Sequence, residues 1–195
     1  MIETVNPKEK TEEELARLMI GKEPPKLLTS EGTPGEVALE FKGVSLDGGH
    51  HVTGLTDIKL TVRAGEIVGI AGISGNGQSR LLGVCMGELK QTKGSVKLFG
   101  EVVDDLDPAE RRAKGLRYVP EQRLGHGSVP EFSLINNTLL TGDDFHSHGF
   151  IKQEEAETFT DLVIERFHVK PEAPKAAARS FSGGNLQKFI VGREI

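Results

Sequence analysis

The sequence GISGNGQS at residues 72–79 constrains the fold of this chain more than any other stretch. Its glycines have the spacing of a P-loop, in which the backbone curls so that N–H groups converge on a phosphate at the start of a helix. An apolar run at 66–71 predicts a buried parallel strand before the loop, and residues 79–86 can begin a helix with their apolar positions inward. A glycine cluster alone is more often a tight turn, but strand, loop and helix occur here in the order that a P-loop requires.

The loop departs from the usual P-loop pattern at one position, where Gln78 replaces a lysine. Glutamine donates a hydrogen bond but carries no charge, and a hydrogen bond to a charged group contributes about 1.5–3 kcal/mol. Arg80 is not expected to substitute for the lysine, because a residue two positions further along a helix projects to a nearly opposite face. The sequence therefore predicts a loop that holds phosphate weakly.

Composition narrows the class of protein. With 195 residues the chain can bury one sizeable core, or one core plus a small appendage. The formal net charge of −5 argues against a general nucleic-acid-binding surface, so no nucleic acid is expected as a partner. The sequence lacks an apolar stretch long enough to span a membrane and lacks a signal-peptide pattern, which favours a soluble, cytoplasmic chain.

Neither the cysteine nor the histidines indicate a reactive or metal-binding site. Cys85 stands among apolar residues, which suits a core position in a reducing compartment. His50 and His51 are adjacent, and His146 and His148 lie in polar, loop-like sequence without the spacing of metal ligands. Metal binding through the histidines is therefore not expected.

The first 35 residues predict a short helix and a linker. Thr11 and Glu14 form a capping box ahead of an apolar stripe, so a helix is expected over about 12–20 and should end at Pro24-Pro25. The residues from there to Gly35 are rich in Pro, Gly, Ser and Thr, which is typical of a linker.

Strands and helices alternate over the remaining sequence. Two patterns of half-exposed strands, at 37–44 and 55–62, are separated by a turn and predict an antiparallel region. The further elements predicted from apolar spacing and capping residues are strands at 94–99 and 116–119 and helices at 107–115 and 152–167. The residues that recur at helical spacing in the last helix are Phe159, Leu162, Val163 and Phe167. This alternation favours the α/β class.

A second glycine motif, RSFSGGNLQK at 179–188, joins a Ser-Gly-Gly turn to a helix with an apolar face. Exposed N–H groups at Ser182, Gly183 and Gly184, reinforced by the helix dipole, would form a second anion site. Taken alone, the motif is more simply an ordinary helix cap. Taken with the P-loop, it resembles the ATP-binding cassette of ABC transporters, in which an SGGQ-type signature follows the P-loop across a helical subdomain.

Further details narrow this resemblance. The signature runs from Phe181 to Asn185 and reads FSGGN, and Glu121 follows Tyr118-Val-Pro where the family's Q-loop carries glutamine. A lysine-free P-loop, a glutamate in the Q-loop and an SGGN signature together resemble the second cassette of bacterial simple-sugar and nucleoside importers, whose ATP-binding subunit carries two cassettes in one chain. Residues 12–21 similarly resemble the join between those cassettes.

The resemblance implies an α/β fold, with a P-loop NTPase (ABC-type ATPase) core, an antiparallel β subdomain and a helical subdomain. It also implies a linker at 1–35 and a partial nucleotide-binding domain at 36–195 that is incomplete at its C-terminal end. The chain stops at Ile195 inside the signature helix, before any strand ending in a Walker B Asp-Glu, D-loop or switch histidine. No aromatic residue stands near Asp47-Gly48, where many cassettes stack adenine.

The mechanism implied by the resemblance is one in which two cassettes sandwich ATP head to tail. The residues implied to hold the phosphates of ATP in a weaker site are Gly72, Ser74, Gly75, Asn76, Gly77, Gln78, Ser79 and Arg80, with the Ser79 hydroxyl on Mg²⁺. The signature residues implied to contact the γ-phosphate of ATP held by the other cassette are Ser182, Gly183, Gly184 and Asn185. No catalytic residue is implied within this chain.

The implied partners are another ABC cassette, transmembrane permease subunits and, indirectly, a substrate-binding protein. The loop at 123–140 would face the membrane subunit, so the chain would lie in the cytoplasm, peripheral on the inner face of the cell membrane. One alternative is a non-transport ABC-type regulatory ATPase, against which the acidic balance counts. The other is a non-functional truncated remnant, whose uncovered sheet edge would invite aggregation. The transported substrate is not indicated, because specificity in this family lies in other subunits.

We expect residues 1–195 alone to show no ATP turnover above background, because the Walker B carboxylates are missing and the P-loop lysine is replaced. The measurement is phosphate release by the purified chain in the presence of Mg²⁺ and ATP. A robust rate that the substitution Ser79→Ala abolishes would contradict this expectation.

Overall fold

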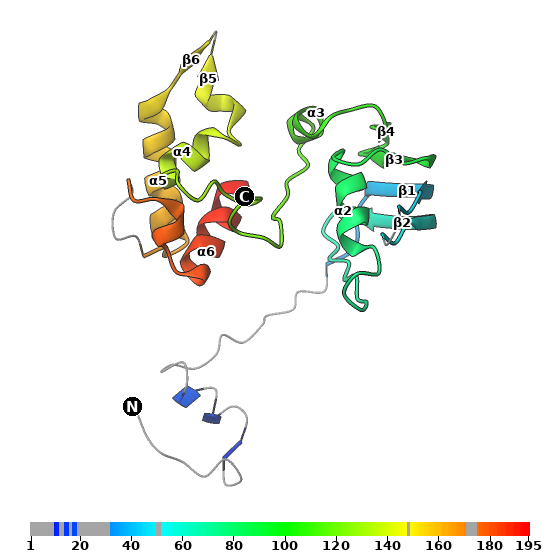
Figure 1. The fold of residues 1–195 in the computed structure, drawn as a ribbon, viewed down its shortest axis with the longest axis horizontal. Coiled ribbons are helices and arrows are strands. Elements are labelled where there is room, and N and C mark those ends of the chain that lie inside the picture. Colours follow the sequence, from blue (N-terminus) through cyan, green and yellow to red (C-terminus); the bar gives the residue numbers. More distant parts are fainter. Residues whose placement is uncertain are drawn as a thin grey trace.

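The computed structural model describes residues 10, 11, 14, 15, 17, 18, 32–49, 52–147, 149–170 and 175–195. The described elements from Val37 onward form a sheet lobe and a helical lobe (Figure 1). The sheet lobe contains β1 (Val37–Leu46), β2 (Leu55–Arg63), α2 (Gln78–Met86), β3 (Lys93–Leu98), β4 (Glu101–Val102) and α3 (Pro108–Ala113). The helical lobe contains α4 (Leu134–Leu139), β5 (His146–Ser147), β6 (Phe150–Ile151), α5 (Gln153–Arg166) and α6 (Gly183–Glu194), with 3₁₀ turns at Asp143–Phe145 and Ala178–Ser180. No described helix is both long enough and apolar enough to cross a membrane.

The four-stranded sheet is antiparallel throughout, in the order β2-β1-β3-β4. This arrangement confirms the antiparallel region predicted at 37–44 and 55–62 and the strand predicted at 94–99. One face of the sheet packs against α2, and Cys85 is buried there, as its apolar neighbours predict. The buried residues of this core are Phe41, Val44, Leu46, Leu55, Leu81, Val84, Cys85, Val96, Leu98 and Val103.

The parallel strand expected at 66–71 and the strand expected at 116–119 do not form, and these predictions are wrong for the structure described. Ile67 is 97% exposed and Ile70 is 50% exposed, although both lie in an apolar run that predicts burial. An apolar pattern identifies a segment suited to the centre of a parallel sheet, but a strand forms only where neighbouring strands bond to it. Within the described residues neither segment has such a neighbour, so both remain without sheet pairing.

Helix α3 begins at the predicted N-cap, where Asp107 and Glu110 form a capping box. Its most buried residue is Arg111, which is 1% exposed. The Arg111 guanidinium donates to the carbonyls of Val84 and Cys85 at 2.7 and 2.8 Å, near the C-terminal end of α2. It also donates to the carbonyls of Val103 and Leu106 at 2.7 and 3.1 Å. The Arg111 side chain therefore supplies hydrogen-bond donors to carbonyls at the end of α2 and fixes this end to the segment before α3.

The helical lobe packs α4, α5 and α6 around a second core, of which Leu134, Phe189 and Ile190 are at most 2% exposed. Helix α5 confirms the helix predicted at 152–167, and Val163 is buried as expected. The apolar spacing places Leu162 on the same face, but Leu162 is 54% exposed. Helix α6 lies close to α5 at Gly192, where an added Cβ atom would meet the Phe167 ring at 2.5 Å.

The N-terminal capping box is present in both directions. The Thr11 N–H donates to Glu14 Oε2 at 3.0 Å, and the Glu14 N–H donates to Thr11 Oγ1 at 3.2 Å. Of the helix predicted over about 12–20, residues 14, 15, 17 and 18 are described and are helical. The other residues of that helix, Pro24-Pro25 and most of the predicted linker lie outside the described residues, as do His50, His51 and His148.

We expect Arg111→Lys to lower the free energy of unfolding by at least about 2 kcal/mol, because one ammonium group cannot donate to carbonyls on both sides of the guanidinium and leaves some unsatisfied. Urea unfolding followed by circular dichroism measures the loss. Arg179→Lys is the matched control, since that side chain is 66% exposed. Equal stability of the two variants would contradict the role given to Arg111.

Candidate functional site

The predicted phosphate loop adopts a curled backbone before α2. Gly75 and Gly77 have φ angles of 90° and 100°, in the left-handed region that glycine enters without a steric cost. The Asn76 N–H donates to the Ile73 carbonyl at 3.2 Å and closes the turn. Gly77 is the N-cap of α2 and supplies no side-chain acceptor, so the first N–H groups of the helix are available to an anion.

Two side chains at the start of α2 occupy different surroundings. Gln78 is half-buried and folds back over the loop, where its Nε2 donates to the Ile73 carbonyl at 3.1 Å. A Cβ atom added to Gly72 would lie 2.5 Å from this Nε2. Ser79 is exposed, and within the described part of the chain its hydroxyl makes no hydrogen bond. A free hydroxyl oxygen at this place fits a Mg²⁺ ion, which prefers oxygen ligands.

Arg80 has a partner outside the phosphate loop. Its Nη2 donates to the carbonyl of Asp47 at 2.9 Å, in the segment between β1 and β2. The same segment passes beside the loop, since an added Cβ at Gly77 would meet the Gly54 carbonyl oxygen at 3.6 Å. In the described residues no cationic side chain bonds to the loop 72–77.

The signature turn caps α6. Ser182 is the N-cap, and its Oγ accepts from the backbone N–H of Asn185 at 3.4 Å and from Asn185 Nδ2 at 3.1 Å. The Asn185 Oδ1 accepts from the N–H of Lys170 at 3.2 Å. Asn185 is therefore held within the turn, where it orients the Ser182 hydroxyl. Gly184 is exposed, and an added Cβ there would meet nothing within 4 Å.

The structure brings Glu121 to the signature and not to the phosphate loop. A cavity of about 420 Å³ is lined by Glu121, Gln122, Arg123, Leu124, Phe181, Gly183 and Leu186. The Arg123 guanidinium lies over the turn, 3.3 Å from where a Cβ on Gly183 would stand. The sequence did not single out Arg123 as a site residue, although a positive charge close after the predicted Q-loop residue was a usable signal. The phosphate loop lies in the other lobe, at the start of α2 (Figure 1).

A buried charge network connects the two lobes. Glu194 near the end of α6 accepts from Arg112 Nη1 of α3 at 2.5 Å and from Arg193 Nε at 3.2 Å. Arg193 also donates to the carbonyls of Gly127 and Asn137, both at 3.0 Å. Burial lowers the pKa of the Arg193 guanidinium, and the Glu194 carboxylate opposes that shift. Among the described residues, Arg112–Glu194 is the ion pair that joins the lobes.

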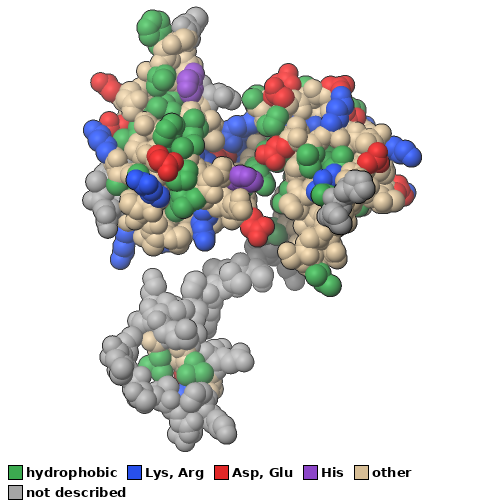
Figure 2. Space-filling view, viewed as in Figure 1, with side chains coloured by type: hydrophobic (Ala, Val, Ile, Leu, Met, Phe, Trp, Pro, Cys, Tyr) green, Lys and Arg blue, Asp and Glu red, His purple; other side chains and the backbone are tan. Residues whose placement is uncertain are grey.

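This network divides the cleft between the lobes. Cavities of about 610 and 580 Å³ lie in the cleft, and Arg112, Arg193 and Glu194 line both of them. On the face seen in Figure 2, acidic and basic side chains are interspersed over both lobes and do not gather into a patch of one sign. In the described ranges, no group of three or more His, Cys, Asp or Glu side chains is arranged to hold a metal ion.

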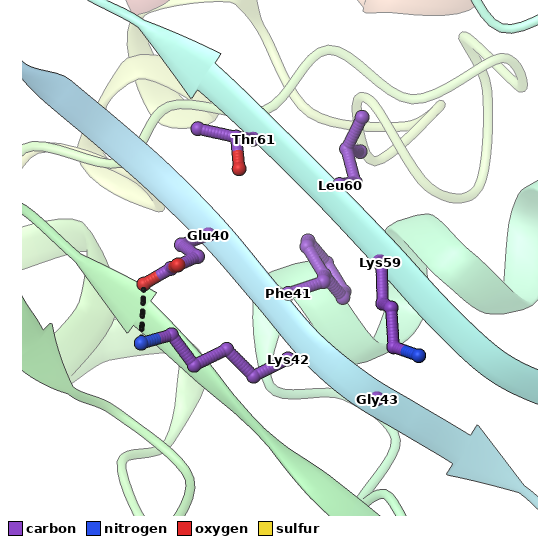
Figure 3. Close-up of a pocket in the computed structure, with 7 residues that line it drawn as sticks. All are labelled: Glu40, Phe41, Lys42, Gly43, Lys59, Leu60 and Thr61. Carbon is purple, nitrogen blue, oxygen red and sulfur yellow. Dashed lines mark ion pairs between the residues drawn. The ribbon is translucent and has the colours of Figure 1, made fainter.

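A further hollow of about 560 Å³ lies on the outer surface of β1 and β2 (Figure 3). Its charged residues are internally matched: Lys42 pairs with Glu40 at 3.3 Å, and Lys59 pairs with Asp57 at 2.8 Å. None of the residues predicted to bind nucleotide lines it. This surface is a solvated sheet face and not a candidate site.

Comparison with known proteins places these features in context. Residues 55–195 match the family described as ABC transporter. The chain is 33% identical over 198 residues to the guanosine import ATP-binding protein NupO of Bacillus subtilis (strain 168). It is 34% identical over 199 residues to the nucleoside import ATP-binding protein NupA of Lactococcus lactis subsp. cremoris (strain MG1363). Both alignments cover 100% of this chain and 39% of the relative, so the chain spans about two fifths of the length of these relatives.

The chain is also similar to a ribose import protein and to two solved structures. The ribose import ATP-binding protein RbsA of Halalkalibacterium halodurans is 33% identical over 162 residues, which is 83% of this chain and 32% of that protein. The dimeric post-hydrolysis structure of the ATP-binding cassette MJ0796, bound to ADP and Pi, gives a TM-score of 0.65 at 23% identity, over 80% of this chain and 68% of that chain. A nucleotide-free cassette from an ABC transporter gives 0.65 at 21% identity, over 81% of this chain and 64% of that chain. The predicted fold class, an α/β P-loop NTPase of the ABC type, is confirmed.

We expect Glu194→Gln to reduce the free energy of unfolding by about 3 kcal/mol, because it leaves the charges of Arg112 and Arg193 without a counter-ion in a buried place. Urea unfolding is again the measurement. Glu131→Gln serves as the control, since Glu131 and its partner Arg179 are each 66% exposed and the change should cost less than about 1 kcal/mol. Equal stability of the two variants would show that the Glu194 charge network does not stabilise the fold.

Proposed function

The chain belongs to the ABC transporter ATP-binding family, and on that premise we propose that it serves as the ATP-binding cassette of an importer for simple sugars or nucleosides. The proposal draws on relatives that are named as guanosine, nucleoside and ribose import ATP-binding proteins. The proposal concerns a whole transporter, whereas this chain matches about two fifths of the length of the ATP-binding relatives.

The first part of the proposal is that residues 72–79 bind the phosphates of ATP weakly. The curled backbone supplies N–H donors, and the N-terminal end of α2 favours negative charge. Ser79 would hold Mg²⁺ through its hydroxyl, and the ion would supply positive charge that neutralises part of the charge on the phosphates. Gln78 adds a neutral donor where a lysine would add a charge, so the protein's own contribution to holding the triphosphate is reduced.

The second part is that the signature turn serves ATP held by a partner cassette. The observation that carries this part is the separation of the two motifs: the signature shares a cavity with Glu121 and Arg123, and no phosphate-loop residue lines that cavity. Ser182, Gly183 and Gly184 are exposed at the start of α6, and the Arg123 guanidinium lies beside Gly183. These groups suit an anion that arrives from outside the chain.

The third part concerns transmission to the membrane. We assign the segment 123–140 to contact with the permease subunits, on the cytoplasmic face of the membrane, with a substrate-binding protein acting indirectly. Arg193 gives this segment a physical link to the signature helix, because it bonds to the carbonyls of both Gly127 and Asn137. A displacement of α6 on cassette pairing would therefore be passed to this segment. Copurification of the complete ATP-binding subunit with a membrane permease tests the transport assignment against a regulatory ATPase.

We expect Gln78→Lys to raise the affinity for Mg²⁺–ATP by at least about tenfold, because it adds a charge-assisted hydrogen bond worth about 1.5–3 kcal/mol. Titration of the purified chain with ATP by calorimetry measures the change. Ser79→Ala is expected to remove the Mg²⁺ dependence of binding while leaving the fold intact, since Ser79 is exposed. Unchanged affinity of Gln78→Lys would show that charge at this position does not limit binding.

A further inference from the structure

Gln78 differs from a lysine in more than charge, because its side chain already bonds to Ile73 within the phosphate loop. The Gln78 side chain is not free: its Nε2 donates to the Ile73 carbonyl at 3.1 Å, from within the loop itself. We propose that Gln78 determines the affinity of the phosphate loop by competing with phosphate for the interior of that loop. This inference rests on the proposed function, because it concerns the same nucleotide loop.

The position of the amide supports this competition. A Cβ atom added to Gly72 would stand 2.5 Å from Gln78 Nε2 and 3.5 Å from its Cδ, so the amide lies directly over the first glycine of the loop. The side chain is half-buried there, whereas residues 72–76 are exposed. The amide therefore occupies space above a backbone whose glycines leave room for a ligand.

The bonding of Ile73 adds a second argument. Its carbonyl accepts both from Gln78 Nε2 and from the backbone N–H of Asn76, at 3.1 and 3.2 Å. These two donors hold the loop closed on itself. A phosphate that enters the loop must displace the Gln78 amide and break its bond to Ile73, so the loss of that bond opposes phosphate binding.

In the described residues, no nearby cationic side chain bonds to the loop to offset the competition by Gln78. Arg80 is bonded to the carbonyl of Asp47, and the Ser79 hydroxyl is available to a cation and not to the loop interior. Lysine at position 78 would differ from glutamine because its charge makes the bond to phosphate stronger than a bond to a neutral carbonyl. The neutral amide lacks that charge, and it must give up its bond to Ile73 and its place over Gly72 before phosphate can enter the loop.

Competition and loss of charge make opposite predictions for removal of the side chain. If Gln78 only supplies a weak donor, Gln78→Ala removes that donor and binding weakens. If Gln78 competes with phosphate, Gln78→Ala opens the loop and binding strengthens. The expected gain corresponds to one intramolecular hydrogen bond, which is about two- to tenfold in affinity.

The experiment is calorimetric titration of the full chain and its variants with Mg²⁺–ATP, and with inorganic tripolyphosphate as a probe that carries the phosphates alone. Gln78→Ala is compared with Gln78→Asn, whose amide is one carbon shorter and cannot reach the Ile73 carbonyl. We expect both variants to bind both probes about two- to tenfold tighter than the unaltered chain. Thermal unfolding of each variant checks that the fold is retained.

The outcomes separate this inference from the function on which it rests. If the unaltered chain and Gln78→Lys bind ATP but Gln78→Ala and Gln78→Asn bind equally or more weakly than the unaltered chain, the competition is overturned and the nucleotide site stands. If no protein binds either probe, Gln78→Lys included, the nucleotide site itself is overturned, and the competition with it.

Discussion

Two adjacent arginines of α3 connect the helix of the phosphate loop to the helix of the signature. Arg111 points into the sheet lobe and bonds to the carbonyls at the end of α2, and Arg112 points to the helical lobe and pairs with Glu194 of α6. Removing either arginine would leave its buried partners without a hydrogen bond or a counter-ion. Loss of either contact therefore destabilises the fold. The short helix between the lobes therefore fixes both motifs through side chains that neither motif contains.

The two motifs differ in what they offer to an anion. The phosphate loop is closed by its own glutamine, and no cationic side chain bonds to loop residues 72–77 within the described residues. The signature turn has an exposed glycine and a guanidinium beside it, and its asparagine holds the serine hydroxyl in position. This asymmetry supports a division of labour, with one surface that holds nucleotide weakly and another that completes a site on a partner.

Local chemistry made part of this structure predictable from the sequence. The glycines of the phosphate loop, the Ser182 cap and the Asp107 capping box depend on residues a few positions apart, and the alternation in β1 and β2 reports one buried face. The strands expected at 66–71 and 116–119 were not predictable in the same way, because sheet pairing depends on neighbours that a local pattern does not contain. Tertiary contacts also determine the burial of Arg111 and Glu194 and the conformation of Gln78. From the sequence alone, a charged or polar side chain is expected to be exposed.

We propose that this chain binds nucleotide at residues 72–79 and that its signature turn does not contact that nucleotide. Amide hydrogen exchange of the chain, with and without saturating Mg²⁺–ATP, tests it most directly. We expect slower exchange at the loop and the first turn of α2, with no change at 182–185. Protection of the signature by the same nucleotide, or no protection at the loop, would contradict it.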